Sequence, residues 1–229
     1  MTLRDALTIA RRAIRANLLP GLLLQAIMVA FLSLYLLHDG TRHFLAGVAD
    51  LKHQTGYWFA FVSYLISAAL LPEILRVVFF QGGKATQSNL WNFLTAAPFW
   101  GLMGMLVDLF YRGQALWFGV GNDWLTILIK VLVDQLLFSP FLSNPLSVSY
   151  FSWRDVRFSV PGARSIFRRG FYFDRVFPVQ VAGWCIWIPG VCLVYFMPPE
   201  LQIPVATLLQ SFWVLVFLLV NRPRLTRQG

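Results

Sequence analysis

The chain is poor in charged residues for its length. Of its 229 residues only 13% are charged and 10 are acidic, whereas 58% are hydrophobic. A soluble domain of this size could not cover so many apolar side chains with polar surface. The composition therefore excludes a soluble globular protein.

The sequence also lacks the residue patterns of common enzymes and metal sites. Cys185 and Cys192 are seven positions apart, which is about 10 Å along a helix and too far for a disulfide with each other. The histidines, His38, His43 and His53, match no metal-ligand spacing. No HExxH, GxSxG or phosphate-binding loop occurs. We expect no catalytic residue, no metal and no cofactor, and an intramembrane enzyme is the least favoured class of function.

The hydrophobic residues are concentrated in six runs. Each has about the 20 residues that a helix needs to cross a hydrocarbon core of about 30 Å. We predict an all-α, polytopic membrane protein with six transmembrane helices, forming one domain over residues 17–229. The runs are residues 18–37, 57–80, 91–111, 124–148, 176–196 and 201–220.

Lysine and arginine gather at alternate ends of these runs. Fifteen of the 19 lie on one side, so the positive-inside bias predicts both termini in the cytoplasm or its organellar equivalent. Topology and anionic lipid account for the net charge of +9 without a nucleic-acid partner. The fifteen are Arg4, Arg11, Arg12, Arg15, Arg76, Lys84, Arg154, Arg157, Arg164, Arg168, Arg169, Arg175, Arg222, Arg224 and Arg227.

Three segments outside the runs have a pattern of their own. Residues 1–16 have apolar residues on one helical face and arginines on the other, which predicts an amphipathic interfacial helix; a mitochondrial transit peptide is the other interpretation. Residues 38–56 are predicted as an exposed polar loop. Residues 151–175, where arginines alternate with aromatic residues, are predicted to lie at headgroup depth.

Helix breakers and small residues mark the runs. Prolines within or near them predict kinks, because proline removes a backbone hydrogen bond. A strip of small residues in the third run, formed by Ala97, Gly101, Gly104 and Met105, predicts close packing of another helix. The prolines are Pro98, Pro140, Pro145, Pro178, Pro189 and Pro204.

Ionisable residues inside the runs are the most informative positions, because a charge in hydrocarbon costs several kcal/mol unless it faces protein or water. Asp134 is predicted near the midplane, followed by Gln135, and Lys130 is one turn away on the same face. Asp108 is predicted at the depth of Lys130 and could pair with it. These four residues either line or gate a solute path, or they form buried pairs, such as Asp134–Lys130, that hold the bundle together.

A second pair of charges lies in the second run. Glu73 and Arg76 are three residues apart after Pro72, and Arg76 can extend toward the surface while its guanidinium binds Glu73. We predict an intramembrane ion pair there.

Two stretches resemble the Mpv-seventeen and twenty-two-kilodalton peroxisomal membrane protein family, over about residues 57–220. In the first, residues 129–142, Lys130, Asp134, Gln135 and Pro140 are similar to the family's Lys-x-x-x-Asp-Gln-x-x-x-x-Pro run. The second, residues 183–213, resembles a late Trp-Pro motif that precedes the last apolar helix. Its matching residues are Trp187, Tyr195, Pro199 and Trp213.

The sequence departs from the family pattern in this second stretch. Ile188 replaces the proline that follows the tryptophan, and Val191 and Val194 replace a glutamine and an asparagine. The run at 18–37 is an addition to the usual layout. Pore chemistry that depends on the replaced side chains is not carried over.

The resemblance implies a membrane protein of a family some of whose members are proposed to form channels. We expect a channel-like protein that permeates small solutes or ions; the alternative is a non-conducting structural or assembly protein. The expected partners are the lipid bilayer, a small solute or ion and a second copy of the chain. The short Arg-rich ends favour the plasma membrane of a bacterium, with the mitochondrial inner membrane as the alternative.

Overall fold

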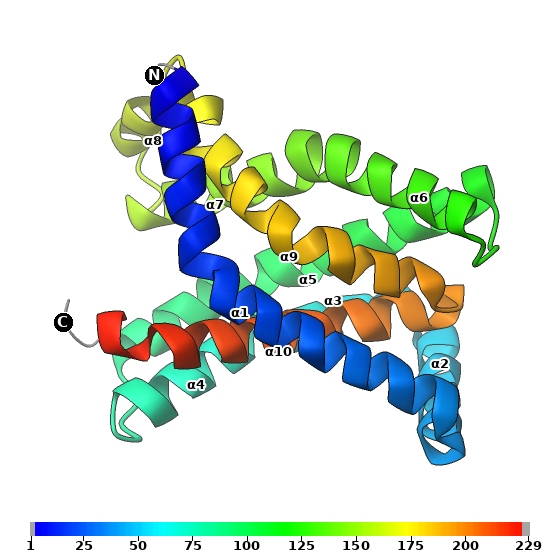
Figure 1. The fold of residues 1–229 in the computed structure, drawn as a ribbon. Coiled ribbons are helices and arrows are strands. Elements are labelled where there is room, and N and C mark those ends of the chain that lie inside the picture. The colour runs from blue at the N-terminus through cyan, green and yellow to red at the C-terminus, as the bar shows by residue number, and fades with distance from the viewer. Residues whose placement is uncertain (1–2, 226–229) are drawn as a thin grey trace.

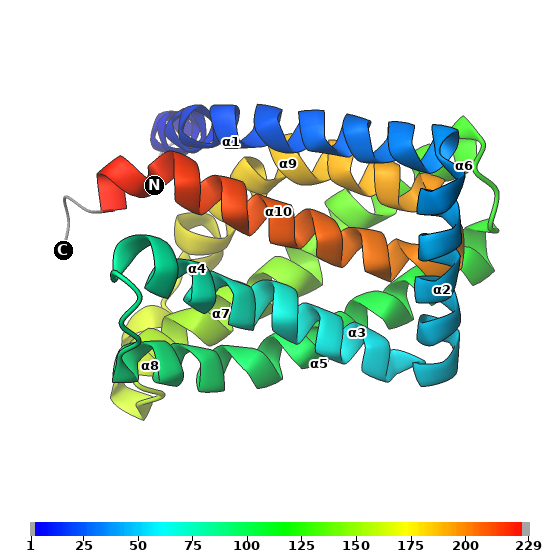
Figure 2. The same cartoon turned by 90° about the horizontal axis from the view of Figure 1, so that it is seen from below.

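The protein is a bundle of long helical rods. The computed structural model describes the backbone of residues 3–225 and the side chains of residues 18–19 and 21–214, and every regular element in that part is a helix. Most rods run along a common direction (Figures 1 and 2). They are α1 (Leu3–Leu37), α3–η1–α4 (Tyr57–Tyr64, Leu65–Leu70, Leu71–Phe80), α5 (Gln87–Phe118), α6–η2–α7 (Trp124–Val133, Asp134–Ser143, Asn144–Asp155), η3–α9 (Tyr172–Val176, Phe177–Phe196) and α10 (Pro199–Leu225), where η denotes a π-helix.

Two short helices mark the ends of the bundle. Helix α2 (Asp39–Thr55) crosses one end, and α8 (Val160–Ile166) lies at the other (Figure 2). We call these the α2 end and the α8 end. The start of α1 and the end of α10 both lie at the α8 end (Figure 2).

The rods have the length and composition of membrane helices. Four are long and apolar enough to cross a membrane, namely Tyr57–Phe80, Gln87–Phe118, Trp124–Asp155 and Tyr172–Phe196. Gly21–Leu37 meets the same criterion of length and hydropathy only when it is joined with Asp39–Thr55, and the two helices are bent by 97° relative to each other. The described residues thus contain four or five candidate spans, against six predicted. The sixth, residues 201–220, lies in α10, whose side chains beyond residue 214 are outside the described part.

The segment after the first run was predicted wrongly as a loop. It forms α2, because His38 caps it by accepting a hydrogen bond from the Thr41 N–H at 3.1 Å, and because its acidic and basic residues complement the helix dipole. The helix ends at Gly56, whose φ of +59° suits glycine. Its residue Lys52 is buried, which the loop prediction did not foresee.

The predicted N-terminal segment is helical but continuous with the first rod. Residues 3–16 belong to α1, and this part is inclined to the rest of the helix (Figure 1). The faces that its side chains present lie outside the described residues. The interfacial position therefore stays a prediction.

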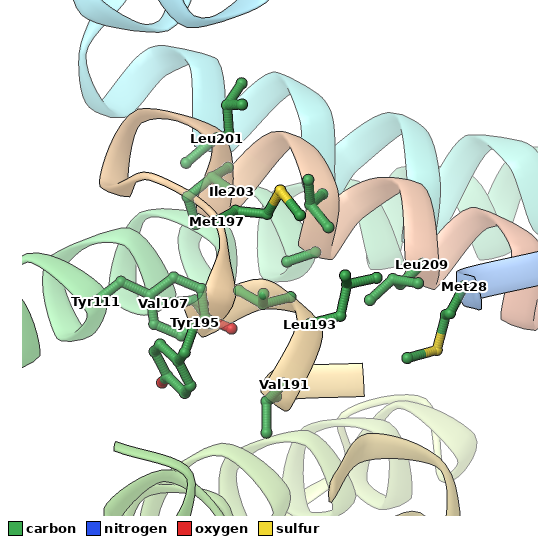
Figure 3. Packing of buried hydrophobic residues seen from close by; sticks show 14 of the residues in the cluster. Met28, Val107, Tyr111, Val191, Leu193, Tyr195, Met197, Leu201, Ile203 and Leu209 are labelled. Atoms are coloured by element: carbon green, nitrogen blue, oxygen red, sulfur yellow. The ribbon is translucent and has the colours of Figure 1, made fainter. Parts of the chain in front are cut away.

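Helix α10 lies inside the bundle. It packs against α1, α2, α3, α4, α5 and α9. Its first half contributes several fully buried residues, among them Leu201, Ile203 and Leu209, to the main hydrophobic core. Figure 3 shows these residues with Tyr111 of α5 and Tyr195 of α9, whose rings meet edge to face at 5.2 Å.

Prolines break three rods through π-helical turns. Segment η1 ends two residues before Pro72, and η3 ends two residues before Pro178. Segment η2 contains Pro140. A π-helical turn lets a chain accommodate proline without a full break. Helix continues through Pro98, Pro189 and Pro204. Kinks were predicted at prolines of these runs, but the π-helical segments were not.

The small-residue strip of α5 is a helix contact. Gly101 and Gly104 are buried against α3. A Cβ on Gly104 would overlap the carbonyl oxygen of Ala60 and lie 2.8 Å from the Tyr64 Cβ. Glycine at this position therefore sets how closely α3 and α5 approach.

We predict that Gly104→Ala lowers the free energy of unfolding by about 1–3 kcal/mol, because the added methyl overpacks a backbone contact. Gly47→Ala is the matched control, since a Cβ there meets nothing within 4 Å, and it should be neutral or stabilise by up to about 1 kcal/mol through helix propensity. Thermal unfolding in detergent measures both. Equal midpoints for the two variants would contradict the assigned contact.

Candidate functional site

A buried carboxylate lies at the first residue of the π-helix η2. Asp134 is 4% exposed, and its Oδ2 accepts a hydrogen bond from the Tyr195 hydroxyl at 2.7 Å. Its Oδ1 accepts from Gln135 Nε2 at 3.0 Å and from Ser139 Oγ at 3.2 Å. Gln114 Nε2 donates in turn to the Tyr195 hydroxyl at 2.5 Å. The carboxylate is thus held by α9 and, through Tyr195, by α5.

Pro140 explains how α9 is attached to the same segment. In a π-helix each N–H bonds to the carbonyl five residues earlier, so Pro140, which has no N–H, leaves the carbonyl of Gln135 without a partner in the ladder. That oxygen accepts from Gln180 Nε2 at 3.3 Å and from Trp184 Nε1 at 3.0 Å. The Asp-Gln-x-x-x-x-Pro run therefore exposes one backbone acceptor and α9 satisfies it.

A cavity of about 490 Å³ extends from Asp134 toward the α8 end. Its lining residues on η2 and α7 run from Asp134 to Asp155, about 30 Å of helix at 1.5 Å per residue. Residues of α3, α5, α9 and α10 complete the walls. Most of the polar groups that line the cavity come from one helical face of η2 and α7. The polar residues of this face are Asp134, Gln135, Ser139, Ser143, Asn144, Ser147, Ser152 and Asp155.

Tyrosines close the inner end of this cavity. Tyr64 and Tyr111 line it beside Asp134, and Tyr111 packs against Tyr195. All three tyrosines are buried. At the other end, Asp155 is exposed and pairs with Arg154 at 3.2 Å. The cavity is therefore open toward the α8 end and blind at Asp134.

A second charged cluster lies at the α2 end. Asp108 is fully buried, with Oδ1 3.1 Å from Lys52 Nζ and Oδ2 3.0 Å from Arg112 Nε. Lys52 Nζ also donates to the carbonyl of Pro199 at 3.1 Å. These contacts attach α2 to α5 and to the start of α10.

Neither pairing considered for Lys130 is present among the described side chains. Asp108 is occupied by Lys52 and Arg112, and Asp134 by three neutral donors. Lys130 is 1% exposed, and its Nζ lies 5.9 Å from the centre of the Tyr195 ring. Tyr195 thus contacts Lys130 with its ring and Asp134 with its hydroxyl.

The other predicted residues lie apart from Asp134 or support it. Arg76 Nη1 is 3.0 Å from Glu73 Oε1, and Asn89 Nδ2 donates to Glu73 Oε2 at 2.7 Å, which connects α4 with α5. Trp187 lines the cavity, and Trp213 packs against the main core.

Three buried partners in these two clusters were not predicted from the sequence. Gln114, Gln180 and Lys52 are each at most 5% exposed, yet the first two carry no charge and the third was assigned to a loop. For Gln180, a glutamine within an apolar run was the available signal, whereas Gln114 lies three residues beyond the end of the third run. A buried amide needs partners just as a charge does, although its desolvation costs less.

Comparison of this chain with protein-family models, with curated proteins and with solved structures finds no match.

We predict that Asp108→Asn lowers the free energy of unfolding by about 3–5 kcal/mol, because it leaves the buried Lys52 ammonium without its counter-ion. Asp39→Asn removes the exposed Asp39–Arg42 pair on α2 and should cost at most about 1 kcal/mol. Thermal unfolding in detergent, with limited proteolysis of α2, measures the difference. If the two variants unfold alike, the Asp108 cluster does not anchor α2.

Proposed function

We propose that this protein lets small polar solutes or ions cross a membrane, through the cavity that extends from Asp134 toward the α8 end. The observation that carries the proposal is the polar face of η2 and α7, which lines a cavity inside rods that are otherwise apolar. Polar side chains inside a membrane bundle face either one another or a water-filled path. Here they line a cavity, and most of them also have a hydrogen-bond or ionic partner in the protein.

A second cavity supports a path that continues toward the α2 end. Its volume is about 510 Å³, and its lining includes Asp108 and Arg112. Tyr111 lines this cavity and the one below Asp134. Tyr111, with Tyr195 beside it, therefore separates two cavities that approach from opposite ends, and we infer that the structure represents a closed state.

In this proposal Asp134 and Gln135 line the path, and Tyr195 is its gate. Opening requires the Tyr195 hydroxyl to leave the Asp134 carboxylate. Gln114 donates a hydrogen bond to the same hydroxyl, so breaking that bond adds to the free energy of opening. Lys130 lies behind the Tyr195 ring and contributes a positive charge on the far side of the gate.

We further propose six membrane crossings, with α10 as the sixth and the α8 end in the cytoplasm. The first half of α10 is buried among helices that are long enough to cross a membrane. We therefore infer that α10 crosses the membrane with them. The arginines of residues 151–175 lie at the α8 end, which the positive-inside rule assigns to the cytoplasm. We also propose that the protein lies in the plasma membrane of a bacterium. The resemblance to the Mpv-seventeen family belongs to the same proposal.

A non-conducting structural protein is the second candidate. The completeness of the Asp134 hydrogen bonds favours it, because three donors satisfy the carboxylate without a solute or water. In that case the residue serves only to hold η2 against α9.

We predict that Asp134→Asn changes the rate or the selectivity of solute flux while the protein remains folded, because it removes the charge at the blind end of the cavity. Stopped-flow light scattering of proteoliposomes challenged with urea, glycerol or potassium chloride measures the flux. Thermal unfolding of the same preparations reports folding. Absence of flux from well-folded wild-type protein, with the variant merely unstable, would establish the structural alternative.

We predict that Tyr195→Phe raises basal flux by about ten- to a hundredfold, since a hydrogen bond to a charged group contributes about 1.5–3 kcal/mol to the closed state. Tyr172→Phe is the matched control. It likewise loses the hydrogen bond of a partly buried hydroxyl, to the carbonyl of Pro140 at 3.0 Å, but that bond does not involve Asp134. A similar rise in both variants would point to general loosening and not to a gate at Tyr195.

We predict that cysteines placed at Lys84 and Ser165 are labelled by a membrane-impermeant maleimide only after the membrane is opened, whereas one at Gly121 is labelled in intact cells. Cys185 and Cys192 are first replaced by serine. The expected pattern follows from the α8 end facing the cytoplasm. Labelling of Lys84 and Gly121 positions from the same side would refute the six-span topology.

A further inference from the structure

The cavity at the α2 end has a cationic corner and an apolar wall. The corner is formed by Lys52 and Arg112, and the wall by Leu109, Leu116 and Val120. The wall residues are 55%, 85% and 66% exposed, so they face whatever surrounds the bundle. A ligand that fills this space must therefore combine an anionic group with an apolar chain.

The charges of the corner do not cancel. Asp108 is the only carboxylate among the described residues that line this cavity, and it pairs with both Lys52 and Arg112. The lining of this cavity therefore holds one more cation than carboxylate, while Glu200 lies with Lys52 and Arg112 in the adjoining cavity. An anion placed beside Arg112 would face the guanidinium and not a carboxylate of this lining.

The guanidinium is held with its free edge available. Arg112 binds Asp108 through Nε, and its Cζ lies 4.8 Å from the centre of the Tyr57 ring. Neither Nη has a hydrogen-bond acceptor in the described part of the chain, and the side chain is 47% exposed. Two parallel N–H groups suit the paired oxygens of a phosphate.

The depth of this corner agrees with a headgroup. Arg112 is in the last two turns of α5, close to the exposed Trp117, and α2 crosses the bundle at the same end. Exposed tryptophan is typical of the membrane–water interface. From there a lipid phosphate reaches Arg112 while its acyl chain lies along Leu116 and Leu109.

We propose that this cavity binds an anionic phospholipid, with the phosphate on Arg112 and an acyl chain against the wall of α5. Basic pockets between membrane helices bind lipid headgroups by the same combination of charge and apolar surface. This binding site shares its cavity with the α2-end part of the path proposed above. Lipid binding there does not require that solutes pass Tyr195, so the two proposals are tested separately.

Lipid binding to purified protein in dodecylmaltoside tests the proposal. Phosphatidylglycerol should raise the thermal midpoint more than phosphatidylcholine, and native mass spectrometry should show it retained. Arg112→Gln should lower the apparent affinity for phosphatidylglycerol about tenfold, because charge-assisted hydrogen bonds are lost. Arg42→Gln is the control: Arg42 is another exposed arginine at the α2 end paired with an aspartate of the preceding turn, but it lies outside the cavity.

A second variant separates lipid from free anion and does not disturb the Asp108 cluster. Leu116→Gln should weaken phosphatidylglycerol binding, whereas Leu37→Gln, at a position 84% exposed but outside the cavity, should not. Inorganic phosphate should leave the midpoint unchanged. Wild-type affinity in the folded Arg112 or Leu116 variant, equal responses to the two lipids, or a full response to phosphate alone would each overturn the proposal.

Discussion

The buried carboxylate of Asp134 must obtain its hydrogen-bond donors from the protein, because the surrounding rods are apolar. Three neutral donors satisfy it, one from α9 and two from its own segment. Tyr195 then carries the connection to Gln114 of α5. The positions of α5, η2 and α9 relative to one another depend on this chain of hydrogen bonds, and so does the blind end of the cavity.

The π-helical form of η2 serves the same arrangement. Pro140 withdraws one N–H from the ladder, and the carbonyl of Gln135 turns to Gln180 and Trp184. The segment therefore presents a carboxylate and a backbone acceptor to α9 within two residues. Toward the α8 end, polar side chains of η2 and α7 line the cavity, and Asn144 among them also donates to Gln180 of α9 at 2.6 Å. Packing and cavity thus have a common origin in one proline and one aspartate.

The two ends of the bundle differ in how charge is held. At the α2 end the buried Lys52 and Asp108, with the half-exposed Arg112, form a cluster that connects α2, α5 and α10. At the α8 end the cavity is open, and the one described ion pair beside its mouth, Arg154–Asp155, is largely exposed on the acidic side. A buried cluster loses several kcal/mol when one partner is removed, whereas an exposed pair loses little. Removal of a charge should therefore destabilise the α2 end more than the α8 end.

The sequence by itself determined the helical class, the approximate limits of the helices and the place of Asp134 inside one of them, because long apolar runs and rare charges are local properties. The Glu73–Arg76 contact was also local, since three-residue spacing places both on one helical face. The tertiary structure alone decided that Asp108 pairs with Lys52, because α2 had first to fold across the end of the bundle. It likewise decided that Tyr195 stands between Lys130 and Asp134. Partners far apart in the chain are chosen by the packing of whole helices, and that information is not present in the spacing of residues along any one of them.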